Sequence, residues 1–211
     1  MSWSLNEIES LARKAARGAG FSWGLAEEAG YAARWLAGVN LPGPEALANL
    51  LIAQDGTAFS ALRPTHTDVD TWQASGGTLC PISTGTALGD KARMLPAQCR
   101  LSDVAQPLLL VPFIAGAANI AQQTLFLEWP GAAFHVGSNL RGCVTTPFAQ
   151  AQTVLLKQGG RTSLPLLRCQ LRYDLAPGAA ADLNNLAQRT YAPDTDASRL
   201  GGAGAGLSDN D

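Results

Sequence analysis

Cysteine and histidine are the side chains of this sequence best suited to nucleophilic and acid–base chemistry, and it has four and two of them. Cys80 precedes PISTGTALGD, which is typical of a helix start, where the helix dipole lowers the pKa of a thiol. His135 would take the thiol proton, and Asp90 would orient the imidazole. The spacing does not demonstrate such a catalytic set. A buried Cys80 that packs as a small apolar residue is the simpler alternative.

The same stretch could hold an anion. Ser83, Thr84 and Thr86 surround Gly85. Free backbone N–H groups at a helix start, joined by these hydroxyls, could bind a carboxylate or a phosphate. Serine and threonine also cap helices without any ligand, so the pattern has a purely structural alternative.

Arginine side chains offer a second place for an anion. Arg168, Arg172 and Asp174 alternate in LLRCQLRYDL, so they would share one face of a strand, where an arginine could hold a carboxylate by two parallel hydrogen bonds. Arg172 is therefore a candidate ligand-binding residue. Arg199, near the C-terminus, is a second candidate. A solvated sheet face needs no such role.

The C-terminal stretch GGAGAGLSDND, residues 201–211, is rich in glycine and ends in acids. It matches neither the phosphate-binding loop pattern nor the dinucleotide-binding pattern. Asp209 and Asp211 are candidate ligand-binding residues, and arginines, a helix N-terminus or a cation would be their partners. The stretch would act as a lid or as an arm that reaches a neighbouring subunit.

Metal binding has one candidate group. His66, Asp68 and Asp70 stand at a spacing of two, so on an extended segment they would share a face. Beside Pro64 the same residues are typical of a solvated turn. The four cysteines are far apart, which favours neither a cysteine zinc site nor a disulfide framework. The sequence therefore predicts no metal site and identifies no cofactor.

The elements that would position these residues begin with three helices in residues 1–55. Ser4 and Glu7 form a capping-box pattern, and an apolar stripe at helical spacing follows it. Ser22 would cap a second helix, in which Gly24 and Gly30 permit close approach of another backbone. A third helix would start near Pro44 and end before QDG at residues 54–56.

Residues 56–176 are predicted to be rich in strands. TLFLEW and AAFHVG would form a hairpin that turns at Pro130 and Gly131, and a second hairpin would turn at Gly159 and Gly160. PLLLVPFI would be a buried strand with a bulge or an edge at Pro112, and LLRCQLRYDL a half-buried antiparallel strand. Residues 177–211 would hold a helix and the Gly-rich tail.

These elements predict one α+β domain over residues 1–211, in which N-terminal helices pack on a mostly antiparallel sheet. Charged residues make up 15% of the chain, below the usual ~25%, which favours a homo-oligomer. The net charge of −2 and the absence of a Lys/Arg cluster argue against nucleic acid. The apolar run PLLLVPFIAGAANI is too short for a membrane span, and no signal peptide pattern occurs, so we expect a cytoplasmic protein.

Two stretches, SLNEIESLARKAARGAGFSWGLAEEAGYAARWLAG and SRLGGAGAGLSDND, resemble those of a small bacterial family that is defined only as a domain of unknown function. The resemblance extends over the whole chain. It implies a bacterial cytosolic protein, and because no activity is established for the family, it assigns no catalytic residue.

Two classes of function remain open. The first is an enzyme or binding protein for a small molecule, such as a carboxylate or another anion, with its site near residues 80–90. The second is a non-catalytic accessory or assembly subunit with a neutral surface. An enclosed pocket would favour the first, and a flat apolar interface the second.

Overall fold

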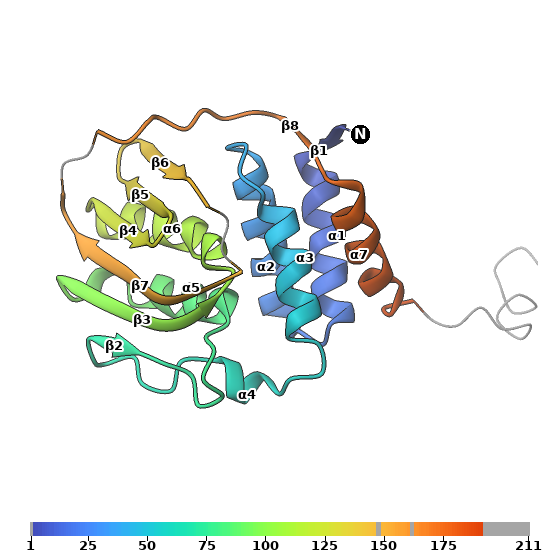
Figure 1. Cartoon of the computed structure of the whole chain (residues 1–211), viewed down its shortest axis with the longest axis horizontal. Helices are drawn as coiled ribbons and strands as arrows, with labels where there is room; N and C mark the ends of the chain where they lie inside the picture. The colour runs from blue at the N-terminus through green and yellow to red at the C-terminus, as the bar shows by residue number, and fades with distance from the viewer. Residues whose placement is uncertain (1, 147–148, 161–162, 192–211) are drawn as a thin grey trace, which may run out of the picture.

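The chain folds into a group of helices beside a six-stranded sheet, and the computed structural model describes residues 2–146, 149–160 and 163–191 (Figure 1). Arg199, Asp209, Asp211 and the Gly-rich tail 201–211 lie outside the described residues. The suggested role of the tail as a lid or an arm stays a prediction.

Four long helices form the helical group. α1 packs on α2 and on α7, and α3 also packs on α2 and α7. Figure 1 shows that α7, although last in the sequence, lies beside α1. The three N-terminal helices and the C-terminal helix were predicted and are confirmed: α1 (Leu5–Gly18), α2 (Trp23–Ala37), α3 (Gly43–Ala53) and α7 (Pro177–Gln188).

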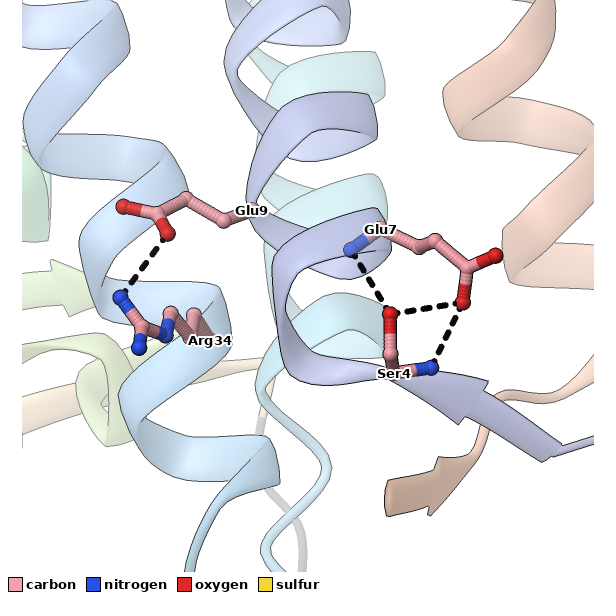
Figure 2. Close-up of polar contacts among 4 residues, drawn as sticks. All are labelled: Ser4, Glu7, Glu9 and Arg34. Carbon is pink, nitrogen blue, oxygen red and sulfur yellow. Dashed lines mark hydrogen bonds and ion pairs between the residues drawn. The ribbon is translucent and has the colours of Figure 1, made fainter. Parts of the chain in front are cut away.

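The capping box at the start of α1 is confirmed (Figure 2). The backbone N–H of Glu7 donates to the Ser4 hydroxyl, 3.3 Å away, and the N–H of Ser4 donates to the Glu7 carboxylate, 2.7 Å away. These bonds satisfy two N–H groups that the helix itself cannot pair. The Ser4 N–H and the Ser4 hydroxyl both donate to the Glu7 carboxylate, the hydroxyl at 2.8 Å, and they lower the pKa of Glu7 because both bonds favour the charged carboxylate.

Small residues let α1 and α2 approach closely. A Cβ atom on Gly30 of α2 would lie 2.9 Å from the carbonyl oxygen of Glu9 in α1. The sequence predicted this close approach at Gly30, and the structure confirms it. An added Cβ on Gly24 would meet no described atom of another segment within 4 Å. The predicted close approach of a second backbone is therefore wrong at Gly24.

The sheet is mixed and mostly antiparallel, as predicted. Its order is β2-β3-β7-β4-β5-β6, and only β2 and β3 pair in parallel. The predicted hairpin at Pro130 and Gly131 is confirmed, with φ of +84° at Gly131. The strands are β2 (Thr71–Trp72), β3 (Gln98–Ala105), β4 (Leu125–Trp129), β5 (Ala132–Val136), β6 (Leu140–Val144) and β7 (Gln150–Gln158).

Two further helices lie between the helical group and the sheet. α5 (Pro81–Asp90) and α6 (Val111–Ala121) pack on each other and on α2, and α6 also contacts β4 and β5. The buried apolar side chains form one connected cluster through all of these elements. Three short helical turns complete this part: α4 (Phe59–Leu62), η1 (Ala92–Met94) and η2 (Pro107–Leu110).

Three strand predictions need correction. PLLLVPFI forms η2 and the start of α6 instead of a strand, because Pro112 lies in the first helical turn, where a missing N–H costs no hydrogen bond. The second hairpin is absent from the described residues, since β7 pairs with β3 and β4 instead. Of LLRCQLRYDL only β8 (Arg172–Asp174) is a strand, and it pairs with β1 (Ser2–Ser4) outside the main sheet.

Residues 163–171 run from the sheet to the helical group, and we call this segment the strap. Figure 1 shows its course from the edge of the sheet at β6 across to β8 beside α1. Among the residues that the structure describes, no helix is long and apolar enough to cross a membrane.

Candidate functional site

Cys80 lies at the N-terminus of α5, as predicted, but its thiol is enclosed. The residue is 1% exposed, and its N–H donates to the carbonyl of Leu62. Burial raises the pKa of the Cys80 thiol, and hydrogen bonds from Ser83 and Ile82 offset only part of that effect. A thiol with a raised pKa and no access to solvent is a poor nucleophile.

The two proposed partners of Cys80 lie elsewhere. His135 on β5 places its Nε2 3.0 Å from the carbonyl oxygen of Gly160. Asp90 ends α5, whose ten residues make the helix about 15 Å long, and it lies close enough to Glu28 of α2 to raise the pKa of Glu28. The geometry therefore does not support the proposed set of Cys80, His135 and Asp90.

The hydroxyl side chains of residues 83–86 belong to α5 itself. The Ser83 hydroxyl donates to the carbonyl of Cys80 at 3.2 Å, and the Thr86 hydroxyl donates to that of Ile82 at 2.9 Å. Thr84 is fully buried. Gly85 faces α6, where an added Cβ would overlap the ring of Phe113. The hydroxyls of Ser83 and Thr86 thus bond within α5, and that of Thr84 is buried without a partner among the described residues, so none of the three is arranged as the expected anion loop.

Two other predicted residues, Arg172 and Asp68, have structural partners. Arg172 donates to the hydroxyl and to the carbonyl oxygen of Ser2, at 3.0 and 2.7 Å, and so fixes β1 beside β8. Asp68 pairs with Lys91. No group of three or more His, Cys, Asp or Glu side chains in the described ranges could hold a metal ion, and this holds for His66, Asp68 and Asp70 as well.

The strap is fastened at both ends. At the sheet, the N–H of Leu167 donates to the Leu140 carbonyl at 3.1 Å, and that of Gly142 to the Pro165 carbonyl at 3.0 Å. At the helices, Gln170 bonds to the end of α2: its N–H donates to the Gly38 carbonyl at 2.7 Å and its side-chain Nε2 to the Ala37 carbonyl at 3.0 Å. The strap thus spans two elements that are far apart in the sequence.

A pocket of about 820 Å³ lies between the strap, α2 and the loop that joins β5 to β6. This volume is within the ~300–1,000 Å³ of typical ligand sites. Most of the lining is apolar, and the segments that supply it are α1, the end of α2, the start of β6 and the strap. Six of its apolar residues are Leu5, Trp35, Val39, Leu140, Leu167 and Leu171.

Two arginines are part of the lining. Arg34 of α2 donates to the Glu9 carboxylate of α1 at 3.0 Å, so its charge is partly balanced (Figure 2). Arg168 of the strap is exposed and has no hydrogen bond or ion pair with any residue that the structure describes. Arg168 therefore gives the pocket an unbalanced positive charge.

Tyr31 also lines this pocket, and its ring packs edge-on against that of Phe113 in α6. Burial and the nearby Glu28 carboxylate raise the pKa of Tyr31, so the phenol stays protonated. A protonated phenol can donate a hydrogen bond to an anion. The pocket therefore combines a mostly apolar surface with the phenol of Tyr31 and with Arg168, a cation that no described residue balances.

The comparison with protein families agrees with the resemblance of the N-terminal stretch and does not test its extension over the rest of the chain. Residues 3–80 match a family described as a protein of unknown function (DUF3726). The match covers α1, α2, α3, α4 and β2, and it ends at Cys80. It does not reach the strap. No curated protein matches the chain.

Arg168 stood out in the sequence as part of an alternating segment, but nothing there connected it with Arg34 or Tyr31. Tyr31 and Arg34 are three positions apart in a helix, which puts them on one face. That spacing was visible in the sequence. The sequence did not reveal the strap, because the alternating residues of that segment also fit a strand.

Proposed function

We propose that this protein binds a small apolar molecule that carries a carboxylate, in the pocket beneath the strap. The observation that supports this most directly is the guanidinium of Arg168, which has no partner among the described residues and lines a mostly apolar pocket of about 820 Å³. An arginine binds a carboxylate through two parallel hydrogen bonds, and the apolar lining would cover the rest of the ligand. The proposal retains an anionic ligand but moves the site away from residues 80–90.

Octanoate and octan-1-ol test the proposal because they share a chain and differ in charge. We expect titration calorimetry to show that octanoate binds at least about tenfold more tightly, since a hydrogen bond to a charged group contributes about 1.5–3 kcal/mol. Arg168→Gln should weaken octanoate binding to the level of octan-1-ol and leave octan-1-ol unchanged.

Arg93→Gln is the matched control, because Arg93 is exposed in η1 and does not line this pocket. It should bind octanoate as the wild type does. Equal affinity of the wild type for the two compounds, or unchanged octanoate binding by Arg168→Gln, would contradict the proposal.

The accessory or assembly role remains the alternative. Leu171 is 85% exposed and Leu166 is 49% exposed at the same pocket, and such side chains could equally contact another protein. Light scattering at tens of micromolar distinguishes an oligomer from a monomer, and the predicted homo-oligomer rests on that measurement.

A further inference from the structure

The second half of α1 is basic. Arg13, Lys14 and Arg17 lie in it, and no acid occurs between residues 10 and 26. Residues three or four positions apart share one face of a helix, so Arg13 and Lys14 both lie beside Arg17. None of the three forms an ion pair with any residue that the structure describes. These side chains therefore give one area of the surface an unbalanced positive charge.

Two exposed aromatic rings lie against these cations. The guanidinium carbon of Arg17 is 4.3 Å from the ring centroid of Trp23, the first residue of α2. Lys14 Nζ is 5.7 Å from the ring centroid of Tyr191 and 3.3 Å from its hydroxyl oxygen. Trp23 is 70% exposed and Tyr191 is 53% exposed. The cations thus hold two large rings in place, although both rings remain open to solvent.

This surface lies where three helices have their ends. α1 ends at Gly18, α2 begins at Trp23, and α7 ends shortly before Tyr191. A Cβ atom on Gly18 would overlap the carbonyl of Leu186, so the last turns of α1 and α7 are in contact (Figure 1). We call the following five residues the basic end: Arg13, Lys14, Arg17, Trp23 and Tyr191.

The composition of the basic end matches the interface of a lipid bilayer. Tryptophan and tyrosine are enriched at membrane–water interfaces, because their rings are apolar and each carries one polar group. Lysine and arginine beside them attract anionic lipids. Glu27, one turn after Trp23 in α2, is an exposed acid nearby, so the three cations still outnumber the acids. A nucleic-acid strand would need cations along a track of several nucleotides, which one short stretch of helix does not supply.

We propose that the basic end is a peripheral contact with a membrane surface that contains anionic lipids. Its two aromatic rings would enter the headgroup region, and its three cations would pair with lipid phosphates. A contact of this kind requires no membrane-spanning helix. The basic end shares no residue with the pocket beneath the strap, so the failure of either proposal leaves the other standing.

Flotation with lipid vesicles tests the proposal. We expect the protein to float with vesicles made of equal parts of phosphatidylcholine and phosphatidylglycerol, and not with vesicles of phosphatidylcholine alone. Raising the salt from about 0.1 M to about 1 M should release most of the bound protein, because the screening length falls from about 10 Å to about 3 Å. Equal binding to both kinds of vesicle, or binding to neither, overturns the proposal.

A double variant tests the cations. Lys14→Gln with Arg17→Gln should weaken binding to the anionic vesicles about 30-fold, which corresponds to about 1 kcal/mol for each cation. The matched control is Arg93→Gln with Arg100→Gln, which removes the same charge at two exposed arginines outside the basic end. It should bind as the wild type does. Equal weakening by the two double variants overturns the proposal, because net charge alone would then decide the binding.

Trp23→Ala tests the aromatic part of the basic end. We expect it to weaken binding about tenfold, since burial of part of a tryptophan ring contributes about 1.4 kcal/mol. Met94→Ala, at an apolar side chain that is 75% exposed in η1, is the control and should change nothing. Unchanged binding by Trp23→Ala overturns the proposal. Displacement of the wild type from the vesicles by a single-stranded oligothymidylate at equal phosphate concentration also overturns it, because nucleic acid would then be the better partner.

Discussion

Glu28 of α2 is a carboxylate in an unfavourable position. It is half-buried, and its acidic neighbours are Asp90 and Glu27. Burial first, and then the repulsion from Asp90 and Glu27, raise the pKa of Glu28. The folded state therefore binds this proton more tightly than the unfolded state. The contribution of Glu28 to the free energy of unfolding falls as pH rises from the ordinary glutamate range through the raised pKa.

Glu28→Gln should consequently raise the melting temperature at pH 7 and have little effect near pH 4. Scanning calorimetry at the two pH values measures the difference. Asp174→Asn removes one negative charge from an exposed position in β8 and serves as the control, for which we expect no such pH dependence. A Glu28→Gln variant that melts lower than the wild type at pH 7 would contradict this interpretation.

The four thiols differ in access, and the order of their reactivity follows from it. Cys80 and Cys99 are buried, Cys143 is half-buried, and Cys169 of the strap is exposed. Burial raises the pKa of Cys80, and it raises that of Cys99 to about 11. We expect iodoacetamide at pH 8 to label Cys169 first and Cys80 and Cys99 last, as measured by mass spectrometry. Early labelling of Cys80 would restore it as a candidate nucleophile.

At the scale of elements, local signals predicted the helices well. Ser4 with Glu7, and Ser22, cap their helices in the structure as the sequence predicted, because a cap depends on residues only a few positions away. The apolar run PLLLVPFI was misassigned because a continuous apolar run has no periodicity that separates a buried strand from a buried helix. The strap was misassigned because an alternating segment forms a strand only if a neighbour pairs with it.

The contact between α1 and α2 can be tested at one glycine. Gly30→Ala would bring a Cβ within 2.9 Å of the Glu9 carbonyl oxygen, so the helices must separate. We expect this to lower the free energy of unfolding by about 1–3 kcal/mol in urea titrations.

Gly24→Ala is the matched control in the same helix. Because nothing lies within 4 Å of an added Cβ, it should instead stabilise the protein by about 0.5–1 kcal/mol, through the lower flexibility of alanine in the unfolded state. Equal effects of the two substitutions would show that helix propensity, rather than the helix contact, decides the outcome at Gly30.

At the scale of the whole molecule, the low charged fraction has a partial explanation within one chain. The alanines of α1 and α2 are buried against each other and against neighbouring helices, so they require no partner subunit. The pocket beneath the strap was not predictable from the sequence, because it combines helical residues with residues of the sheet and the strap. Arg34 and Arg168, for example, are 134 positions apart and line one pocket.

The strap joins the two halves of the molecule, and its attachment at Gln170 can be tested by proteolysis. Gln170 Nε2 donates to the carbonyl of Ala37 and to Oδ1 of Asn40, at 3.0 and 3.1 Å. Gln170→Ala removes both side-chain bonds and leaves only the backbone bond from residue 170 to the Gly38 carbonyl, so it should loosen the end of the strap at α2 while the bonds to β6 persist. Because Arg168 is exposed within the strap, trypsin should then cleave after it several-fold faster than in the wild type.

The control is Gln73→Ala, since Gln73 is exposed and its side chain makes no hydrogen bond with the residues that the structure describes. It should be cleaved after Arg168 at the wild-type rate. If octanoate binds beneath the strap, it should slow cleavage at Arg168 in the wild type, because the bound carboxylate would hold that side chain. Equal rates for Gln170→Ala and the wild type would mean that the side-chain bonds of Gln170 are not needed to hold the strap, and that its backbone bond to Gly38 and the bonds to β6 suffice.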